Sequence, residues 1–200
     1  MPKSRPGRTA RTIGSALAKR IKLVGFDVDG VFTDGGIYIG LVAGNPLEFK
    51  RFHVLDGLGV KLLRTVGLPV VLLSGRESEA SEARAKEMDV DELLQVAPQK
   101  KLAAFIEAVE RRRIALADCA YVGDDLADLP VLRAVGLPIA VANAIVEVKA
   151  AARYVTSAPG GQGAVREVAE RLIKARDEWT GLLAQYFETQ HVAGRIRRSG

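Results

Sequence analysis

Short apolar runs alternate with stretches of helical periodicity between residues 21 and 175, and this alternation constrains the fold more than any other feature of the chain. It is typical of a parallel sheet with helices on both faces. The predicted strands are Ile21 to Phe26, Pro69 to Leu73, Asp91 to Gln95, Cys119 to Val122, Leu137 to Val141 and Tyr154 to Thr156. The predicted helices are Leu58 to Val66, Glu77 to Met88, Lys100 to Arg112, Leu126 to Ala134, Ala144 to Ala151 and Val165 to Phe187. The sequence therefore predicts an α/β fold, a three-layer Rossmann-like parallel sheet.

Residues 36–52 interrupt the alternation. Ile37 to Ile39 and Leu47 to Phe52 are strand-like, and the turn-prone segment Ala43 to Pro46 lies between them, which predicts a β-hairpin projecting from the sheet. An isolated hairpin is only marginally stable in water. We therefore expect its apolar face to pack on something, and another copy of the chain is one candidate.

The net charge of +5 is located at the two ends of the chain. Residues 1–20 hold six basic residues and no acid, residues 189–200 hold three more, and the remainder has 20 basic residues against 24 acidic ones. We therefore expect a flexible basic arm at 1–20, a folded domain at 21–175, and a helical extension with a basic tail at 176–200. Such tails can meet RNA, an anionic membrane or nothing. Because the basic charge lies in the tails, we do not expect a nucleic-acid partner.

Cysteine and histidine are too scarce for several kinds of site. Cys119 is the single cysteine and the chain has two histidines, which excludes an internal disulfide and leaves almost no basis for a zinc site built from thiolates or imidazoles. A metal would therefore be held by oxygen. No apolar run approaches the roughly 18 residues that a membrane span requires, and we expect a cytoplasmic protein.

Two aspartates follow the first predicted strand, at Asp27 and Asp29. Ligand sites in open parallel sheets lie beyond the carboxyl ends of the strands, and side chains two positions apart point the same way. Two carboxylates this close repel each other and need a cation. An all-oxygen site of this kind suits Mg²⁺.

Three more strand ends carry matching groups. Ser74 to Arg76 supplies a hydroxyl and a backbone turn before a helix, where exposed N–H groups can bind an anionic oxygen. Lys100 opens another predicted helix and offers a cation for the same anionic group. The acidic cluster Asp124 to Asp128 can complete the shell of the metal. Each of these features alone is common on protein surfaces, but their shared position at strand ends indicates one site.

These four motifs, in this order, resemble those of the haloacid dehalogenase superfamily of phosphohydrolases. Within that superfamily, the segments 27–35, 52–59, 123–125 and 160–167 resemble the 3-deoxy-D-manno-octulosonate 8-phosphate phosphatase family. The resemblance covers about residues 21–175 and implies a role in lipopolysaccharide biosynthesis.

The resemblance also implies a role for each motif. Asp27 would be the nucleophile that forms an aspartyl phosphate, and Asp29 would protonate the leaving sugar oxygen and then activate water. Mg²⁺ would be held by Asp27, the backbone carbonyl of Asp29, and Asp124. Ser74 and Lys100 would hold the phosphoryl oxygens. The residues expected to support the metal from behind are Asp125 and Asp128.

The gaps between motifs leave no room for a cap domain, because 44 residues separate Asp29 from Ser74 and 23 separate Arg76 from Lys100. An uncapped site is open to water. The resemblance implies that hairpins associate in a homotetramer, in which a neighbouring chain helps to enclose the sugar acid. The candidate substrate contacts are Asp56, Gly75, Arg76 and Arg166.

Three positions depart from the family pattern. His53 and Leu55 stand where the family usually has Asn and Arg, and Asn143 stands where it has Asp.

The alternative substrates are a nine-carbon sugar-acid phosphate and another small phosphomonoester. A noncatalytic protein that binds through its basic tails is a third hypothesis. A phosphoacceptor receiver domain would need neither Asp29 nor the hairpin.

Overall fold

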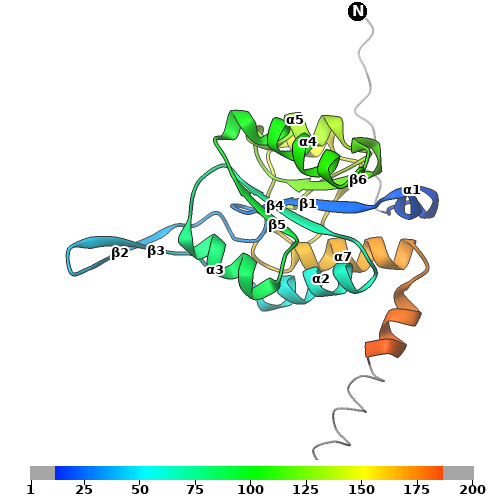
Figure 1. Ribbon diagram of the computed structural model, residues 1–200, viewed down its shortest axis with the longest axis horizontal. Coiled ribbons are helices and arrows are strands. Elements are labelled where there is room, and N and C mark those ends of the chain that lie inside the picture. The colour runs from blue at the N-terminus through cyan, green and yellow to red at the C-terminus, as the bar shows by residue number, and fades with distance from the viewer. Residues whose placement is uncertain (1–11, 187–200) are drawn as a thin grey trace, which may run out of the picture.

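The computed structural model describes residues 12–186, and its centre is a six-stranded parallel sheet with the strand order β5-β4-β1-β6-β7-β8 (Figure 1). This arrangement confirms the predicted fold class. The strands are β1 (Leu23–Asp27), β4 (Val70–Ser74), β5 (Glu92–Gln95), β6 (Cys119–Gly123), β7 (Leu137–Ala140) and β8 (Tyr154–Val155). Because β1 lies between β4 and β6, the carboxyl ends of three central strands meet at one edge of the sheet.

Helices cover both faces of the sheet, with α4 and α5 on one side and α2, α3 and α7 on the other (Figure 1). The helices are α1 (Ser15–Arg20), α2 (Val54–Thr65), α3 (Glu79–Met88), α4 (Lys101–Arg111), α5 (Leu129–Ala134), α6 (Val146–Ala151) and α7 (Ala164–Ala175). Short 3₁₀ turns are η1 (Pro98–Lys100), η2 (Leu116–Asp118) and η3 (Leu126–Asp128). Lys100, the first residue of the helix predicted at 100–112, therefore belongs to the turn η1, and α4 begins one residue later, at Lys101.

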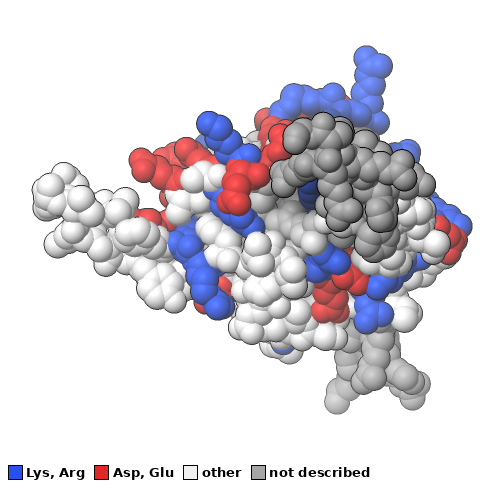
Figure 2. All heavy atoms as spheres, turned by 90° about the horizontal axis from the view of Figure 1, so that it is seen from below, with Lys and Arg blue, Asp and Glu red and all other residues white. Residues whose placement is uncertain are grey.

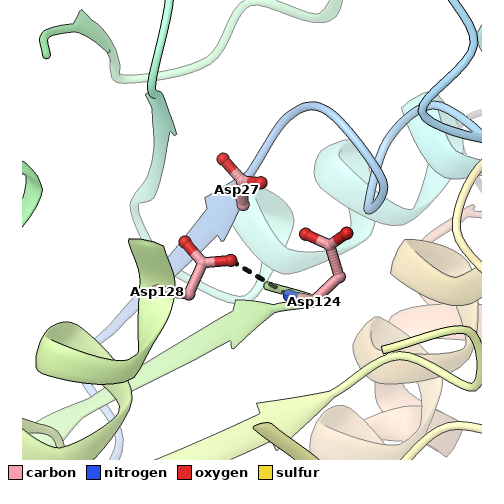
Figure 3. Close-up of side chains that lie close together, drawn as sticks. All are labelled: Asp27, Asp124 and Asp128. Carbon is pink, nitrogen blue, oxygen red and sulfur yellow. Dashed lines mark hydrogen bonds between the residues drawn. The ribbon is translucent and has the colours of Figure 1, made fainter. Parts of the chain in front are cut away.

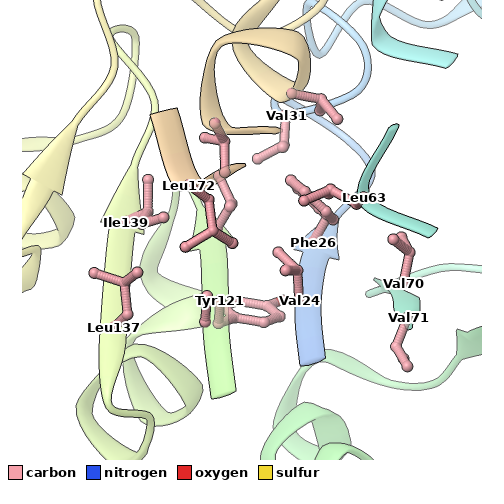
Figure 4. Close-up of a cluster of buried hydrophobic side chains, with 14 of the residues drawn as sticks. Val24, Phe26, Val31, Leu63, Val70, Val71, Tyr121, Leu137, Ile139 and Leu172 are labelled. Carbon is pink, nitrogen blue, oxygen red and sulfur yellow. The ribbon is translucent and has the colours of Figure 1, made fainter. Parts of the chain in front are cut away.

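The core fills the space between the sheet and these helices (Figure 4). All five residues of β1, β4 and β6 are buried, because strands covered on both faces need no polar side. In α7, Val165, Val168, Ala169, Leu172 and Ile173 have no exposed surface and form one apolar stripe. Burying a side chain of the Leu or Ile size contributes about 1.5–3 kcal/mol.

The hairpin forms a separate antiparallel sheet of β2 (Tyr38–Val42) and β3 (Asn45–Phe49). Ala43 and Gly44 form its two-residue turn with φ values of 50° and 81°, as a type I′ turn requires. Ile39 and Leu41 are 73% and 74% exposed. Figure 2 shows the hairpin projecting at the left, with no basic or acidic side chain along most of its length.

The amino-terminal prediction needs a correction. Ile13 and Ala18 are buried in the core, and Arg176 donates hydrogen bonds to the carbonyl oxygens of Ala18 (3.2 Å) and Ile21 (2.9 Å). Residues 13–20 are therefore not part of a flexible arm, because a few apolar side chains within a basic segment are enough to dock it. Residues 1–11 lie outside the described part of the chain.

The carboxyl-terminal helix also differs from the prediction. It stops at Ala175, Asp177 adopts a left-handed conformation (φ 64°), and residues 179–186 form a second helical segment. Leu182 of that segment is buried in the core, whereas Phe187 and the basic tail lie outside the described residues. Within residues 12–186, no helix combines the length and the apolarity that crossing a bilayer requires.

Candidate active site

Asp27, Ser74 and Asp124 lie at the carboxyl edge of the three central strands. Asp27 ends β1 and is level with Leu73, the residue before Ser74. Phe26 is level with Val122, which places Asp124 just beyond the end of β6. Parallel strands therefore bring together three side chains that are distant in the sequence.

Asp27, Asp124 and Asp128 form a carboxylate cluster, in which one oxygen of each lies within 4.8 Å of the other two (Figure 3). Asp27 and Asp128 are buried. The dashed line in Figure 3 marks the hydrogen bond that the Asp124 N–H donates to Asp128 Oδ2 at 3.0 Å. Three carboxylates so close together repel one another unless a cation lies among them.

The cluster fits a divalent cation in a second respect. Asp124 Oδ1 is buried and has no hydrogen-bond partner among residues 12–186. Asp124 Oδ2 has space only because residue 30 is glycine, where a Cβ would come within 2.0 Å of this oxygen. A buried carboxylate oxygen without a donor is costly, and a hard cation that takes oxygen ligands would satisfy it.

Lys101 supplies positive charge to the cluster. Its ammonium lies 2.6 Å from Asp27 Oδ1 and 2.9 Å from Asp128 Oδ1, and its side chain is 3% exposed. Burial by itself lowers the pKa of Lys101, but the attraction of Asp27 and Asp128 outweighs it and raises the pKa. The Tyr121 hydroxyl donates a further hydrogen bond of 2.9 Å to Asp128 Oδ1.

Two carboxyls of the cluster, Asp27 and Asp124, have raised pKa values. Burial, followed by repulsion from Asp128, raises the pKa of Asp27 well above its usual range against the opposing effect of Lys101. Burial and Asp128 also raise the pKa of Asp124 to about 6. Both carboxyls therefore resist ionisation without added positive charge, which a bound cation would supply.

The prediction for Lys100 is wrong by one residue. Lys100 ends η1 and is exposed, whereas Lys101 begins α4 and reaches the cluster. One residue turns a helical side chain by about 100° around the axis, so the neighbour of a correct position points elsewhere. The sequence did carry the signal, because Phe105, Ala108 and Val109 follow Lys101 at the spacing of one buried face.

Asp29 lies apart from the cluster and binds a residue that the sequence analysis missed. Its Oδ1 is 2.7 Å from the ammonium of Lys50, whose side chain has no exposed surface. The loop after β1 turns back tightly, since the N–H groups of Val31, Phe32 and Thr33 all point at the Val28 carbonyl. Lys50 was not identifiable because only the folded hairpin brings it to this loop.

The loop after β4 lies beside the cluster. The buried Ser74 hydroxyl donates a 2.8 Å hydrogen bond to the Arg76 carbonyl. A Cβ on Gly75 would be 3.6 Å from Cε of Lys101, so this backbone passes close to the buried lysine. The Arg76 guanidinium is 2.7 Å from Glu48 of the hairpin.

Asp56, one of the predicted substrate contacts, has its carboxylate engaged by the fold itself. It is fully buried and caps α7, accepting hydrogen bonds from the N–H groups of Gly163 (3.3 Å) and Arg166 (2.9 Å). Burial raises its pKa, although these hydrogen bonds oppose the rise. The Arg166 side chain pairs with Glu170 at 2.8 Å. Asp125 caps η3 through the Leu126 N–H at 2.7 Å.

The glycine-rich segment supports the loop that carries Asp29. Gly161 donates to the Val31 carbonyl at 3.0 Å, and a Cβ on Gly160 would lie only 1.8 Å from the Gly30 carbonyl oxygen. Asn143 joins the two segments, because it donates to the Gly30 carbonyl (3.2 Å) and accepts from the Gly160 N–H (2.7 Å). These glycines allow one backbone to pack directly on another.

The fold, the carboxylates and the serine at three strand ends, and the buried lysine define a haloacid dehalogenase-like hydrolase. The model of the family described as haloacid dehalogenase-like hydrolase matches residues 95–167. A curated relative, 3-deoxy-D-manno-octulosonate 8-phosphate phosphatase of Escherichia coli K12, is 42% identical over 161 residues, which cover 80% of this chain and 84% of the relative. The chain belongs to the 3-deoxy-D-manno-octulosonate 8-phosphate phosphatase family.

Two solved structures of that family are similar to this chain. The Moraxella catarrhalis phosphatase, in complex with a magnesium ion, a phosphate ion and a KDO molecule, is 37% identical with a TM-score of 0.81, over 86% of this chain and 97% of that one. The cobalt-bound form of the Haemophilus influenzae phosphatase is 35% identical with a TM-score of 0.74, over 80% of this chain and 92% of that one.

Proposed function

We propose that this phosphatase is a Mg²⁺-dependent phosphomonoesterase that hydrolyses 3-deoxy-D-manno-octulosonate 8-phosphate through an aspartyl phosphate. The observation that carries the proposal is the carboxylate cluster of Asp27, Asp124 and Asp128 with Lys101 beside it. The names of the relatives support the choice of sugar acid and magnesium.

Mg²⁺ would be held by the carboxylates of Asp27 and Asp124 and by the backbone carbonyl of Asp29. When bound, it would neutralise charge on the phosphoryl oxygens and on the nucleophile. Asp128 supports this set from behind, since it accepts hydrogen bonds from Lys101, Tyr121 and the Asp124 N–H.

The residues of the chain then divide the reaction in two. An Asp27 carboxylate oxygen forms a bond to phosphorus while the bond from phosphorus to the sugar oxygen breaks, and Asp29 gives its proton to that oxygen. Water next attacks the aspartyl phosphate and loses a proton to Asp29, which releases phosphate and restores Asp27. Lys101 and Ser74 hold phosphoryl oxygens during both steps.

The substrate contacts that remain in this proposal are Gly75, Arg76 and Arg166, beside a site with an open side. The exposed apolar hairpin favours a homotetramer in which a neighbouring chain covers that side. Cys119, the single cysteine, is buried and forms no disulfide, and a chain that uses so little cysteine fits a cytoplasmic enzyme.

A panel of phosphate esters tests the proposal. The panel contains the eight-carbon substrate, a nine-carbon sugar-acid phosphate and simple alkyl phosphates, each assayed with Mg²⁺ and with EDTA. We expect the highest kcat/KM on the eight-carbon ester, with activity lost in EDTA and in Asp27→Asn. A preference for the nine-carbon ester would reassign the substrate, and turnover that survives both EDTA and Asp27→Asn would overturn the mechanism.

A further inference from the structure

Lys50 is a buried lysine outside the carboxylate cluster. It follows the last residue of β3, and its side chain has no exposed surface. Its ammonium lies 2.7 Å from Asp29 Oδ1, 3.0 Å from Ser81 Oγ and 3.7 Å from Glu48 Oε1. Burying an ammonium group costs several kcal/mol unless its partners compensate, so this placement depends on the set of three oxygen partners.

Ser81 and Glu48, the partners of Lys50 besides Asp29, are themselves held in place. Ser81 is a buried residue of α3. Glu48 accepts a 2.6 Å hydrogen bond from the Ser78 hydroxyl and pairs with Arg76 at 2.7 Å. The Lys50 ammonium is therefore fixed by the base of the hairpin and by α3, so it can hold Asp29 in one orientation.

Asp29 is the side chain that gains from being held. Its carboxylate is 26% exposed, on a loop whose backbone hydrogen bonds fix the main chain and not the χ angles. A free aspartate on such a loop samples several rotamers. Proton transfer needs one geometry, and misplacement by about 1 Å can cost about 10²-fold in rate.

We propose that Lys50 is a positioning residue that orients Asp29 for proton transfer, which ties the base of the hairpin to the chemistry. This inference rests on the proposed function, in which Asp29 is the acid and base. The experiment must distinguish this role of Lys50 from two others. Lys50 could only fasten the hairpin to α3, or it could bind the phosphoryl group itself.

Leaving-group dependence separates these roles. An alkoxide needs a proton as it leaves, whereas 4-nitrophenolate does not, so a defect in acid catalysis affects kcat/KM for alkyl esters selectively. For Lys50→Met we expect a loss of about 10²-fold on 3-deoxy-D-manno-octulosonate 8-phosphate and of less than about 5-fold on 4-nitrophenyl phosphate. Asp29→Asn should show the same selectivity, and Lys50→Arg should recover part of the loss.

Lys22→Met is the matched control, because Lys22 is an exposed lysine paired with Asp118 at the amino end of β1. It should leave both rates unchanged. If Lys50→Met does not fold, Ser81→Ala removes one anchor of the ammonium and should give a smaller loss with the same selectivity. Equal losses on both esters, or no loss, would overturn the role of Lys50. If the parent enzyme turns over neither ester with Mg²⁺, the proposed function fails instead.

Discussion

Replacing Lys101 by methionine tests the electrostatics of the site most directly. The change removes the ammonium that contacts Asp27 at 2.6 Å and Asp128 at 2.9 Å while keeping a side chain of similar length. At an effective dielectric constant of about 20, each contact is worth about 6 kcal/mol of attraction. Much of this is offset by the cost of desolvating the ions, and breaking a buried pair costs about 3–5 kcal/mol in practice.

Lys100→Met is the matched control, since Lys100 is the exposed neighbour. Urea unfolding in EDTA near pH 7 should show the loss of about 3–5 kcal/mol for Lys101→Met and a change within about 0.5 kcal/mol for Lys100→Met. The pKa of Lys101 is raised in the folded state, so its stabilising contribution is complete below about pH 10 and is lost only as the pH rises through the raised value.

Activity and metal rescue complete the test. Lys101→Met should lose at least about 10²-fold in kcat, and Mg²⁺ should stabilise this variant more than the parent because the cation replaces part of the missing charge. Equal stability of the two variants in EDTA, or a loss of activity only in Lys100→Met, would refute the assignment of Lys101.

Four further results are expected. Asp27→Asn should fold normally and lose all turnover, which circular dichroism and a phosphate-release assay would show, and residual activity near the parent rate would contradict its role as nucleophile. The pKa of Asp124 is raised from 3.8 to about 6, so the free energy of unfolding of the metal-free protein should fall by up to about 3 kcal/mol, reduced by solvent screening, as the pH rises from about 4 to 7. The stabilisation by Mg²⁺, measured by urea unfolding with and without the ion, should grow over the same pH range. A stabilisation by Mg²⁺ that does not change with pH would count against the site. Light scattering at micromolar concentration should give a tetramer that Leu41→Asp dissociates, whereas a fully active parent monomer of 21.5 kDa would disprove the assembly. Deleting residues 1–11 should leave kcat and stability unchanged, while deleting 1–18 also removes the buried Ile13 and Ala18 and should cost about 2 kcal/mol or more; equal stability of the two truncations would show that α1 adds nothing.

The parts of the site that lie on strand ends were predictable from the sequence. Asp27, Ser74 and Asp124 each follow an apolar run, and the parallel topology itself carries them to one edge. Lys101 needed the exact start of a helix, which the 3₁₀ turn at Pro98–Lys100 displaced by one residue. Local pattern does not resolve helix starts to that accuracy.

Other contacts depend on packing that no local pattern expresses. Lys50 reads as an exposed charge at the end of a hairpin until β3 folds back over α3 and Asp29. Asp56 lies in a segment that resembles a family motif, yet its carboxylate accepts hydrogen bonds from the backbone of a helix more than 100 positions away. The burial of Ile13 was not predicted, because it lies in a segment of basic composition. A count of charges describes the whole segment and does not identify the apolar side chains that pack on the core.

The backbone contact between the glycine-rich segment and the Asp29 loop has a consequence for folding. Asn143 donates a hydrogen bond to the carbonyl oxygen of Gly30, 113 positions before it in the sequence. Arg176 donates one to the carbonyl oxygen of Ala18, 158 positions before it. Contacts this distant in sequence form late, because the entropy of closing the intervening loop must be overcome first. A chain emerging from the ribosome thus carries Asp27 and Asp29 early, but their loop gains its backbone support only after Gly161 has been synthesised and docked. Competence for chemistry is one of the last properties that this fold acquires.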